Sequence, residues 1–217
     1  AVKIPESVET IGASAFMDCS SLKEIVLPQK LTSIDANVFT GCTSLRRVTI
    51  QEYVTSIALT GFIICKQLEE FIISPANSKY CSVDGIIYNS RKSILYMVPA
   101  KVKISDLVID KKVKKIEKGA FRGCQTIQSI VIPSSITKFN DYTFEDCKNL
   151  RKINIPEGTT EIPFFFLSGC SSLEEITLPE SLSFILMKAF DGCSALRRIS
   201  LPRNVSVIVG GFDGCDD

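Results

Sequence analysis

Residues 4–28 read IPESVETIGASAFMDCSSLKEIVLP, and this stretch decides the fold because the rest of the chain repeats its pattern. The repeat is clearest in the apolar residue that precedes a proline or takes the equivalent place. This residue recurs every 23 positions at Ile4, Leu27, Ile50 and Ile73 and, after an interruption, at Ile109, Ile132, Ile155, Leu178 and Leu201. A fixed period of this length is typical of solenoid proteins, in which each repeat forms one structural turn.

Four more columns of residues keep the same period. They begin at Ile11, Phe16, Cys19 and Leu22, and each continues through the later units. One unit cannot bury these apolar columns alone. Stacked units can, since each column then becomes a continuous buried stripe.

The strand of each unit is predicted by alternation. Ile25 and Leu27 would point inward and Glu24 and Val26 outward, and Pro28 would end the strand because it cannot donate a backbone hydrogen bond. We therefore expect an α/β repeat solenoid of the leucine-rich-repeat type. It would be a right-handed superhelix with a concave parallel β-sheet and short helical or irregular convex segments, such as residues 36–42.

The interruption predicts one enlarged unit. Cys65 and Cys124 are 59 residues apart, which is two periods plus 13. We expect a single domain over 1–217, with three units over 4–73, a modified unit with a hairpin insertion over 74–108, four units over 109–201 and a truncated unit over 202–217. Asp84 and Gly85 suit the hairpin turn. Neither end offers a polar cap, so we expect a piece of a longer array or ends that something else covers.

Composition excludes several classes of function. The net charge is +1 and 23% of residues are charged, which gives no reason to expect general attraction to nucleic acid. No apolar stretch is long enough to span a bilayer, and residues 1–5 resemble the middle of a repeat, so we expect any targeting segment to be absent or removed. The chain has no histidine, the commonest general base and metal ligand.

The units resemble the BspA-like, or Treponema pallidum-type, leucine-rich repeats over essentially the whole chain. Even the odd unit is similar to a hairpin variant of that family, in residues 77–88 and 95–99. The resemblance implies a bacterial cell-surface or secreted protein associated with adhesion to host proteins or other cells. It carries no catalytic motif and no binding residues that transfer to this chain.

The nine cysteines favour core packing over chemistry. Only Cys81 lies off the repeat column, and no C-x-x-C pair supports a zinc site. Because a free cysteine behaves as a small hydrophobe, the seven column cysteines from Cys19 to Cys193 are predicted to be reduced and buried. We expect no metal and no cofactor.

Charges on the predicted sheet alternate in sign from unit to unit, as at Lys23-Glu24, Arg46-Arg47 and Glu69-Glu70. The pattern favours a self-neutralising ladder and argues against a strongly charged ligand on this face. The basic stretch over 101–118 is interpreted as a solvated turn, with an anionic glycan or nucleic acid as its alternative.

A second feature is a candidate aromatic patch in the seventh unit. Phe164 and Phe165 occupy columns that other units fill with small or polar residues, and Tyr142 and Met187 hold matching positions on either side. This group could be a partner-binding patch. Local repacking into the core is the equal alternative.

The function that follows is a non-enzymatic binding or adhesion module, with a structural spacer or an enzyme of unrecognised type as alternatives. The partner would be a protein or glycan, such as host extracellular matrix or another cell surface, with no nucleic acid and no membrane insertion. We place the candidate binding surface on the sheet near the modified unit, where tyrosines are enriched. The competing account is that the tyrosines only cover the hairpin. The candidate surface comprises Tyr80, Tyr88, Tyr96, Arg47, Thr49, Glu70, Ile72, Ser129 and Val131.

Overall fold

The computed structural model describes residues 2–203, 205–207 and 210–215. Asn204, which begins a glycosylation sequon, lies outside the described residues. The chain forms two compact units, which are described separately below. Unit 1 comprises residues 1–92 and 96–102, and unit 2 comprises residues 93–95 and 103–217.

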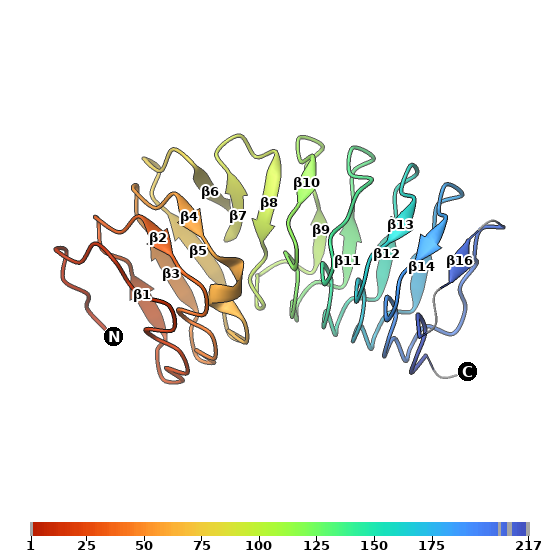
Figure 1. Cartoon of the computed structure of the whole chain (residues 1–217), viewed down its shortest axis with the longest axis horizontal. Coiled ribbons are helices and arrows are strands. Elements are labelled where there is room, and N and C mark those ends of the chain that lie inside the picture. Colours follow the sequence, from red (N-terminus) through yellow and green to blue (C-terminus); the bar gives the residue numbers. More distant parts are fainter. Residues whose placement is uncertain (1, 204, 208–209, 216–217) are drawn as a thin grey trace. The chain divides into compact units, whose positions relative to one another are not determined.

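Unit 1 begins with a parallel sheet of three strands, one from each turn (Figure 1). They are β1 (Glu24–Val26), β3 (Arg47–Ile50) and β5 (Glu70–Ile73). Two of the turns each contribute a second, shorter strand. These strands, β2 (Ser33–Ile34) and β4 (Ser56–Ile57), pair parallel. Paired residues are 23 positions apart, as Glu24 and Arg47 are, so the sequence period is the register of the sheet.

The modified unit contains the predicted hairpin. Strands β6 (Tyr80–Val83) and β7 (Ile86–Asn89) pair antiparallel, with Val83 opposite Ile86. Asp84 and Gly85 join them with φ of 51° and 80°, the positive values that a tight two-residue turn requires at both central positions. A side chain at Gly85 would lie 2.8 Å from Cβ of Glu70, so this turn packs closely on β5. The next strand, β8 (Ile94–Met97), has residues in both units.

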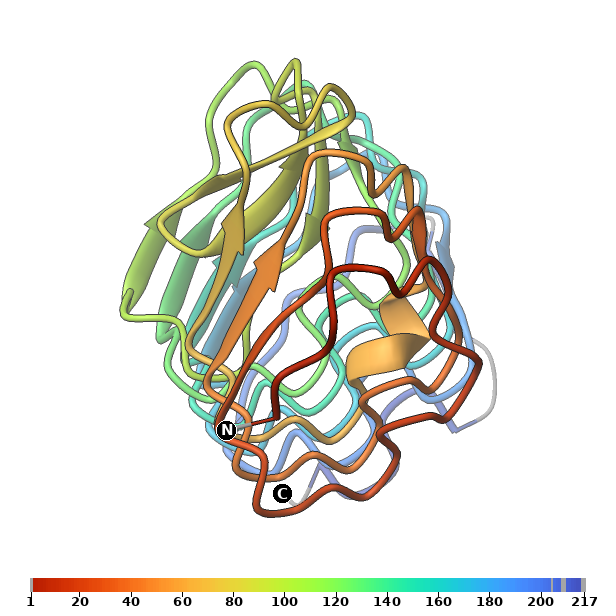
Figure 2. The ribbon, with the colours of Figure 1, turned by 90° about the vertical axis from the view of Figure 1, so that its left-hand side faces the viewer.

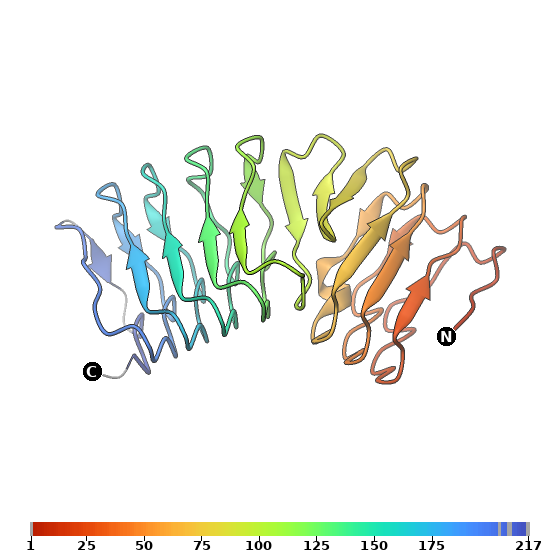
Figure 3. The same ribbon diagram turned by 180° about the vertical axis from the view of Figure 1, so that it is seen from behind.

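Unit 2 repeats the same plan (Figure 3). Its main sheet is parallel and contains β9 (Asp106–Val108), β11 (Ser129–Val131), β12 (Lys152–Asn154) and β14 (Glu175–Thr177) in that order. The shorter strands are β13 (Glu161–Ile162), β15 (Phe184–Ile185) and β16 (Ser206–Val207). In addition, β10 (Lys115–Ile116) pairs with Ile94 and Leu95 of β8.

The segments opposite the strands are mostly irregular, which is one of the two forms expected from the sequence. Among the described residues the only helix is η1 (Leu59–Phe62), a short 3-10 helix that lies across unit 1 from its sheet (Figure 2). Residues 36–42 instead form tight turns, with positive φ at Asn37 and Gly41. Their amides donate from turn to turn, as in Phe39 N to the Gly61 oxygen at 2.8 Å. An α-helix would need those donors within the segment, so the irregular alternative holds for residues 36–42.

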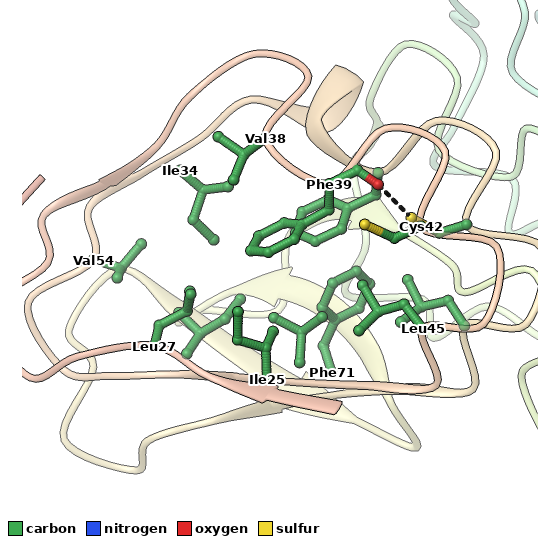
Figure 4. Close-up of a cluster of buried hydrophobic side chains, with 14 of the residues drawn as sticks. Ile25, Leu27, Ile34, Val38, Phe39, Cys42, Leu45, Val54 and Phe71 are labelled. Carbon is green, nitrogen blue, oxygen red and sulfur yellow. Dashed lines mark hydrogen bonds between the residues drawn. The ribbon is translucent and has the colours of Figure 1, made fainter. Parts of the chain in front are cut away.

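The buried columns are those that the sequence predicted. In unit 1 the rings of Phe16, Phe39 and Phe62 stack with centroids 5.6 and 5.5 Å apart. Isoleucines and leucines of the strands face these rings from the sheet side (Figure 4). In unit 2 the column continues through Phe121 and Phe144, whose centroids are 4.8 Å apart.

The cysteine column lies beside the phenylalanines. Five of these thiols donate a hydrogen bond to a backbone carbonyl 26 residues earlier, as Cys65 does to Phe39 at 3.1 Å and Cys147 to Phe121 at 3.1 Å. The predicted reduced state is confirmed for the described cysteines, which are all free thiols. Burial holds from Cys42 to Cys193 along the column, but Cys19 is only half-buried because it lies in the first turn.

Candidate interaction surfaces

The outward face of the unit 1 sheet carries two columns of side chains. In the first, Arg47 bridges two carboxylates, with Nη1 2.8 Å from Oε1 of Glu24 and Nε 2.6 Å from Oε1 of Glu70. The second column contains Val26, Thr49 and Ile72 on adjacent strands. The predicted ladder is therefore present, and of the candidate residues Arg47, Thr49 and Glu70 are half-buried while Ile72 is exposed.

The outward face of the unit 2 sheet has the same two columns. Asp106 accepts hydrogen bonds from the hydroxyls of Ser105 and Ser129, which lower the pKa of its carboxyl. Further along, Lys152 pairs with Glu175 at 2.8 Å. In the second column Val108 lies opposite Val131, and the two side chains are 70% and 55% exposed. A column of polar and charged side chains, in which the lysine is paired, therefore runs beside two adjacent, solvent-exposed valines.

Two of the three tyrosines of the candidate surface are buried and therefore not available to a ligand. Tyr80 is 4% exposed and Tyr88 is 8% exposed. The ring of Tyr96 is half-buried and contacts that of Tyr80 edge to face at 5.1 Å. This corrects the expectation that these rings form a binding surface. The competing account is the one the structure supports, because the rings pack inside unit 1 beside the hairpin.

The seventh unit divides its aromatic residues between core and surface. Phe166 and Leu167 are fully buried, and the ring of Phe166 contacts that of Phe144 edge to face at 5.1 Å. Phe166 stands in the column that other units fill with a small residue such as alanine, and Leu167 stands in the phenylalanine column. Phe164 remains 38% exposed and Phe165 half-buried, so the expected outward pair is present alongside local repacking.

The outward aromatic rings form an ordered stack. Tyr142 and Phe165 are stacked with centroids 5.1 Å apart and an interplanar angle of 14°. Cations cover the outer faces of the stack, with Lys118 and Arg122 over the tyrosine at 5.1 and 5.4 Å and Lys188 over the phenylalanine at 5.9 Å. Each contact of this kind stabilises a surface pair by about 0.5–1 kcal/mol.

The same cations also contact carboxylates. Lys118 pairs with Asp141 at 3.2 Å, Arg122 with Glu145, and Lys188 with Asp191 at 4.0 Å. In all three pairs the cation is the more exposed partner. Burial raises the pKa of the Glu145 carboxyl, and Arg122 opposes that shift. The cations are therefore the more exposed charges around the stack, although positive and negative charges balance in number.

The cysteine column offers no reactive site. Burial raises the pKa of the Cys42 thiol to about 11 and that of Cys65 to about 12, and it raises the pKa of Cys193 further. Because the thiolate is the nucleophile and the metal ligand, these groups are inert at neutral pH. Within the described ranges no group of three or more cysteines and carboxylates is placed to hold a metal ion.

Two features of these surfaces escaped sequence reasoning. Val108 lies on an outward strand position whose alternation could have identified it beside Val131. Two of the cations over the aromatic stack precede Tyr142 by 20 to 24 positions, and the third follows Phe165 by one turn. The repeat period was the only sequence signal that could have placed these cations beside the rings.

Among the described residues, the structure contains no helix with the length and apolar character needed to cross a membrane.

The family model for the BspA type leucine rich repeat region matches residues 1–97 and 92–216 in six copies. The chain belongs to that family. No curated protein matches its sequence. The sequence-based resemblance is thereby confirmed, and it agrees with two units built from 23-residue turns.

Solved structures agree on the fold. A leucine-rich repeat protein from Eubacterium ventriosum is 23% identical over 89% of this chain, with a TM-score of 0.68. A leucine rich cell surface protein from Faecalibacterium prausnitzii is 24% identical over 88% of the chain and 68% of its own, with a TM-score of 0.63. The pneumococcal vaccine antigen PcpA is 23% identical over 86% of the chain and 47% of its own, with a TM-score of 0.56. The chain spans 64% of the length of the E. ventriosum protein.

Proposed function

We propose that the chain is a non-enzymatic protein-binding module of a bacterial cell-surface or secreted protein, and that it binds through the outward face of its strands. The observation that carries the proposal is the exposed pair Val108 and Val131 on registered neighbouring strands. Adjacent exposed apolar side chains rimmed by polar residues are typical of protein interfaces. The right-handed superhelix and the concave placement of the sheet remain part of this proposal.

The charge column beside the valines supports binding by shape and apolar contact. Arg47 and Lys152 each satisfy carboxylates on neighbouring strands, so little net charge is left for a ligand. A partner would then bury the second column, which includes Ile72 in unit 1 and Val131 in unit 2. Fibrous host extracellular matrix proteins and proteins of other cell surfaces are the partner class that the family suggests.

Surface plasmon resonance on the purified chain tests the proposal. Fibronectin, fibrinogen, laminin and collagen would be passed over the immobilised protein, and we expect saturable binding to at least one of them. The double variant Val108→Ser, Val131→Ser should weaken this binding about tenfold, as loss of interface anchors does. Met17→Ser is the matched control, because Met17 is exposed but lies in a turn.

Binding that is identical in the double variant and the control would contradict the sheet-face assignment. Failure of every matrix protein and of intact host cells to bind would favour the alternative of a structural spacer that presents other domains. Location is tested separately. Antibody raised against the chain should label intact bacteria or the culture medium, and labelling only after lysis would contradict a surface role.

A further inference from the structure

The stack of Tyr142 and Phe165 sits on a backbone conformation that does not favour aromatic residues. Both residues have positive φ, 60° and 54°. The equivalent residues in other turns are Ser14, Asn37, Gly119 and Lys188, which are also at positive φ. Small residues adopt this conformation at lower cost, since a bulky side chain crowds its own backbone there. Two aromatic side chains in consecutive turns are therefore kept at a cost to folding, which points to a use at the surface.

The neighbouring residues extend the stack into an apolar patch. Backbone hydrogen bonds join the three turns, from Tyr142 N to the Phe164 oxygen at 3.1 Å and from Phe165 N to the Met187 oxygen at 3.4 Å. Phe164 and Met187 are 38% and 42% exposed. We use the name ring patch for Tyr142, Phe164, Phe165 and Met187. It lies outside the strands of the main sheet and is distinct from the Val108–Val131 face.

Charge around the ring patch decides what it would bind. Lys118, Arg122 and Lys188 lie over its rings, and each is more exposed than the carboxylate that pairs with it. An incoming carboxylate can therefore approach these cations from the solvent side, although each of them already pairs with a carboxylate of this chain. The apolar centre of the ring patch is best covered by apolar side chains of a partner, and the flexible side chain of Met187 can adapt to partners of different shape.

A sugar ligand fits less well. Sugars bind aromatic side chains by stacking on an open ring face. Here the inner faces of Tyr142 and Phe165 cover each other, and cations lie over the outer faces. The edges of the rings and the side chains of Phe164 and Met187 remain for contact.

We propose that the ring patch of unit 2 docks an acidic segment of a partner polypeptide, one in which apolar side chains alternate with carboxylates. The apolar side chains of the segment would pack on Phe164 and Met187, and its carboxylates would pair with Lys118, Arg122 and Lys188. This surface would act in addition to the sheet face and does not depend on it.

A displayed library of random peptides supplies the probe. Peptides are selected on the immobilised chain after depletion on the double variant Phe164→Ser, Met187→Ser, in which two exposed side chains are changed. We expect the enriched peptides to share aspartate or glutamate next to leucine, phenylalanine or tryptophan. No enrichment, or enrichment without an acidic bias, would overturn the proposal.

The best peptide is then synthesised and its dissociation constant measured by fluorescence polarisation, with circular dichroism to confirm that each variant is folded. Phe164→Ser, Met187→Ser and Lys118→Gln, Lys188→Gln should each weaken binding about tenfold or more, and added salt should weaken binding to the wild type. The sheet-face variant Val108→Ser, Val131→Ser should bind the peptide as the wild type does.

Three results would contradict the proposal. Equal affinity for the wild type and the ring-patch variant would show that the peptide binds elsewhere. Loss of binding in the sheet-face variant would show that the peptide binds to the Val108–Val131 face instead. Binding of a sulfated oligosaccharide that the ring-patch variant abolishes, with no binding of the peptide, would make the ligand an anionic glycan.

Discussion

At the residue scale, the cysteine column is a set of hydrogen-bond donors in the core. The thiol of Cys65 donates to Phe39 and that of Cys193 to Leu167, in each case across one turn. Burial favours the neutral thiol and so raises its pKa. These cysteines act as packing residues whose one polar group is satisfied.

The raised pKa values predict slow thiol chemistry. At pH 8 a free cysteine is roughly one quarter thiolate, whereas a thiol of pKa about 12 is about one ten-thousandth thiolate. We expect Cys65 and Cys193 to react with a thiol reagent only after denaturation, and half-buried Cys19 and Cys215 to react first. Mass spectrometry of the labelled peptides measures the order. Early labelling of Cys65 in the folded chain would contradict it.

The same shifts set a direction for stability against pH. A folded-state pKa above the ordinary thiol value of 9.0 means that the folded chain holds its thiol protons more tightly than the unfolded chain. The contribution is complete below about pH 9 and is lost as pH rises toward about 12. Denaturant unfolding at a series of pH values should show the free energy of unfolding falling across this window. Cys65→Ala should reduce the slope.

Ile64 predicts a stabilising substitution. It has a φ of 64°, is β-branched and is exposed, while the equivalent residue in the preceding turn is Gly41 at 75°. Ile64→Gly should raise the free energy of unfolding by about 1 kcal/mol, because relief of the left-handed strain exceeds the small loss of burial. Gly41→Ala is the opposite control and should destabilise. Thermal melts of the two variants should move in opposite directions.

At the element scale, neighbouring strands are held in order by side chains as well as by the backbone. Arg47 of β3 lies between Glu24 of β1 and Glu70 of β5, and all three are partly exposed. Exposed pairs of this kind stabilise a protein by no more than about 1 kcal/mol. Their main effect is on register, because a shift of one strand by one residue would separate the charges.

Charge reversal at the centre of this ladder gives the fourth prediction. Arg47→Glu places three carboxylates on adjacent strands and should lower the free energy of unfolding by about 1–2 kcal/mol at low salt, with a smaller loss at high salt. Adding Glu70→Arg should restore part of the loss. Urea unfolding at two salt concentrations measures both effects. A loss that does not change with salt would assign the effect to packing.

The sequence predicted a residue's environment correctly where that environment depends on contacts within its own turn and with residues at the same repeat position in neighbouring turns. Ile25 and Leu27 face inward because alternation and the proline after them are local signals. It left residues 36–42, whose amides bond to the next turn, open between a short helix and an irregular segment. It failed for Tyr80 and Tyr88, whose burial depends on how the hairpin folds back. Helical propensity and tyrosine enrichment contain no information about those contacts. In the ring patch the exposed phenylalanine was predicted, but the cations beside it were not.

At the scale of the whole molecule, each turn contacts mainly the turns before and after it. Phe144 is fully buried and its ring contacts those of Phe121 and Phe166. In proteins of this kind stability is approximately a sum of turn terms and nearest-neighbour terms. Damage to one turn should therefore spread over a short distance along the stack.

Phe144→Ala tests this expectation and the division into two units. Loss of a buried phenylalanine costs about 3–5 kcal/mol. Hydrogen exchange should accelerate in residues 121–124, 144–147 and 166–170, whereas amides of unit 1 keep their rates. Phe184→Ala is the control, because that ring is exposed on β15. Acceleration over the whole chain would show that 1–217 unfolds as the single domain expected from the sequence.

The constant register of the strands also bears on how the gene can change. Ser129 pairs with Lys152 and Lys152 with Glu175, each 23 positions on, so the backbone of a turn meets the same partners wherever the turn lies in the stack. Removing residues 133–155 would join Ile132 to Pro156 and leave an apolar residue followed by proline, as before. Unequal recombination between repeats can therefore shorten or lengthen the coding sequence in steps of 69 nucleotides. A step of another length keeps the core columns in phase only where the extra residues leave the stack, as those of the modified unit do in their hairpin.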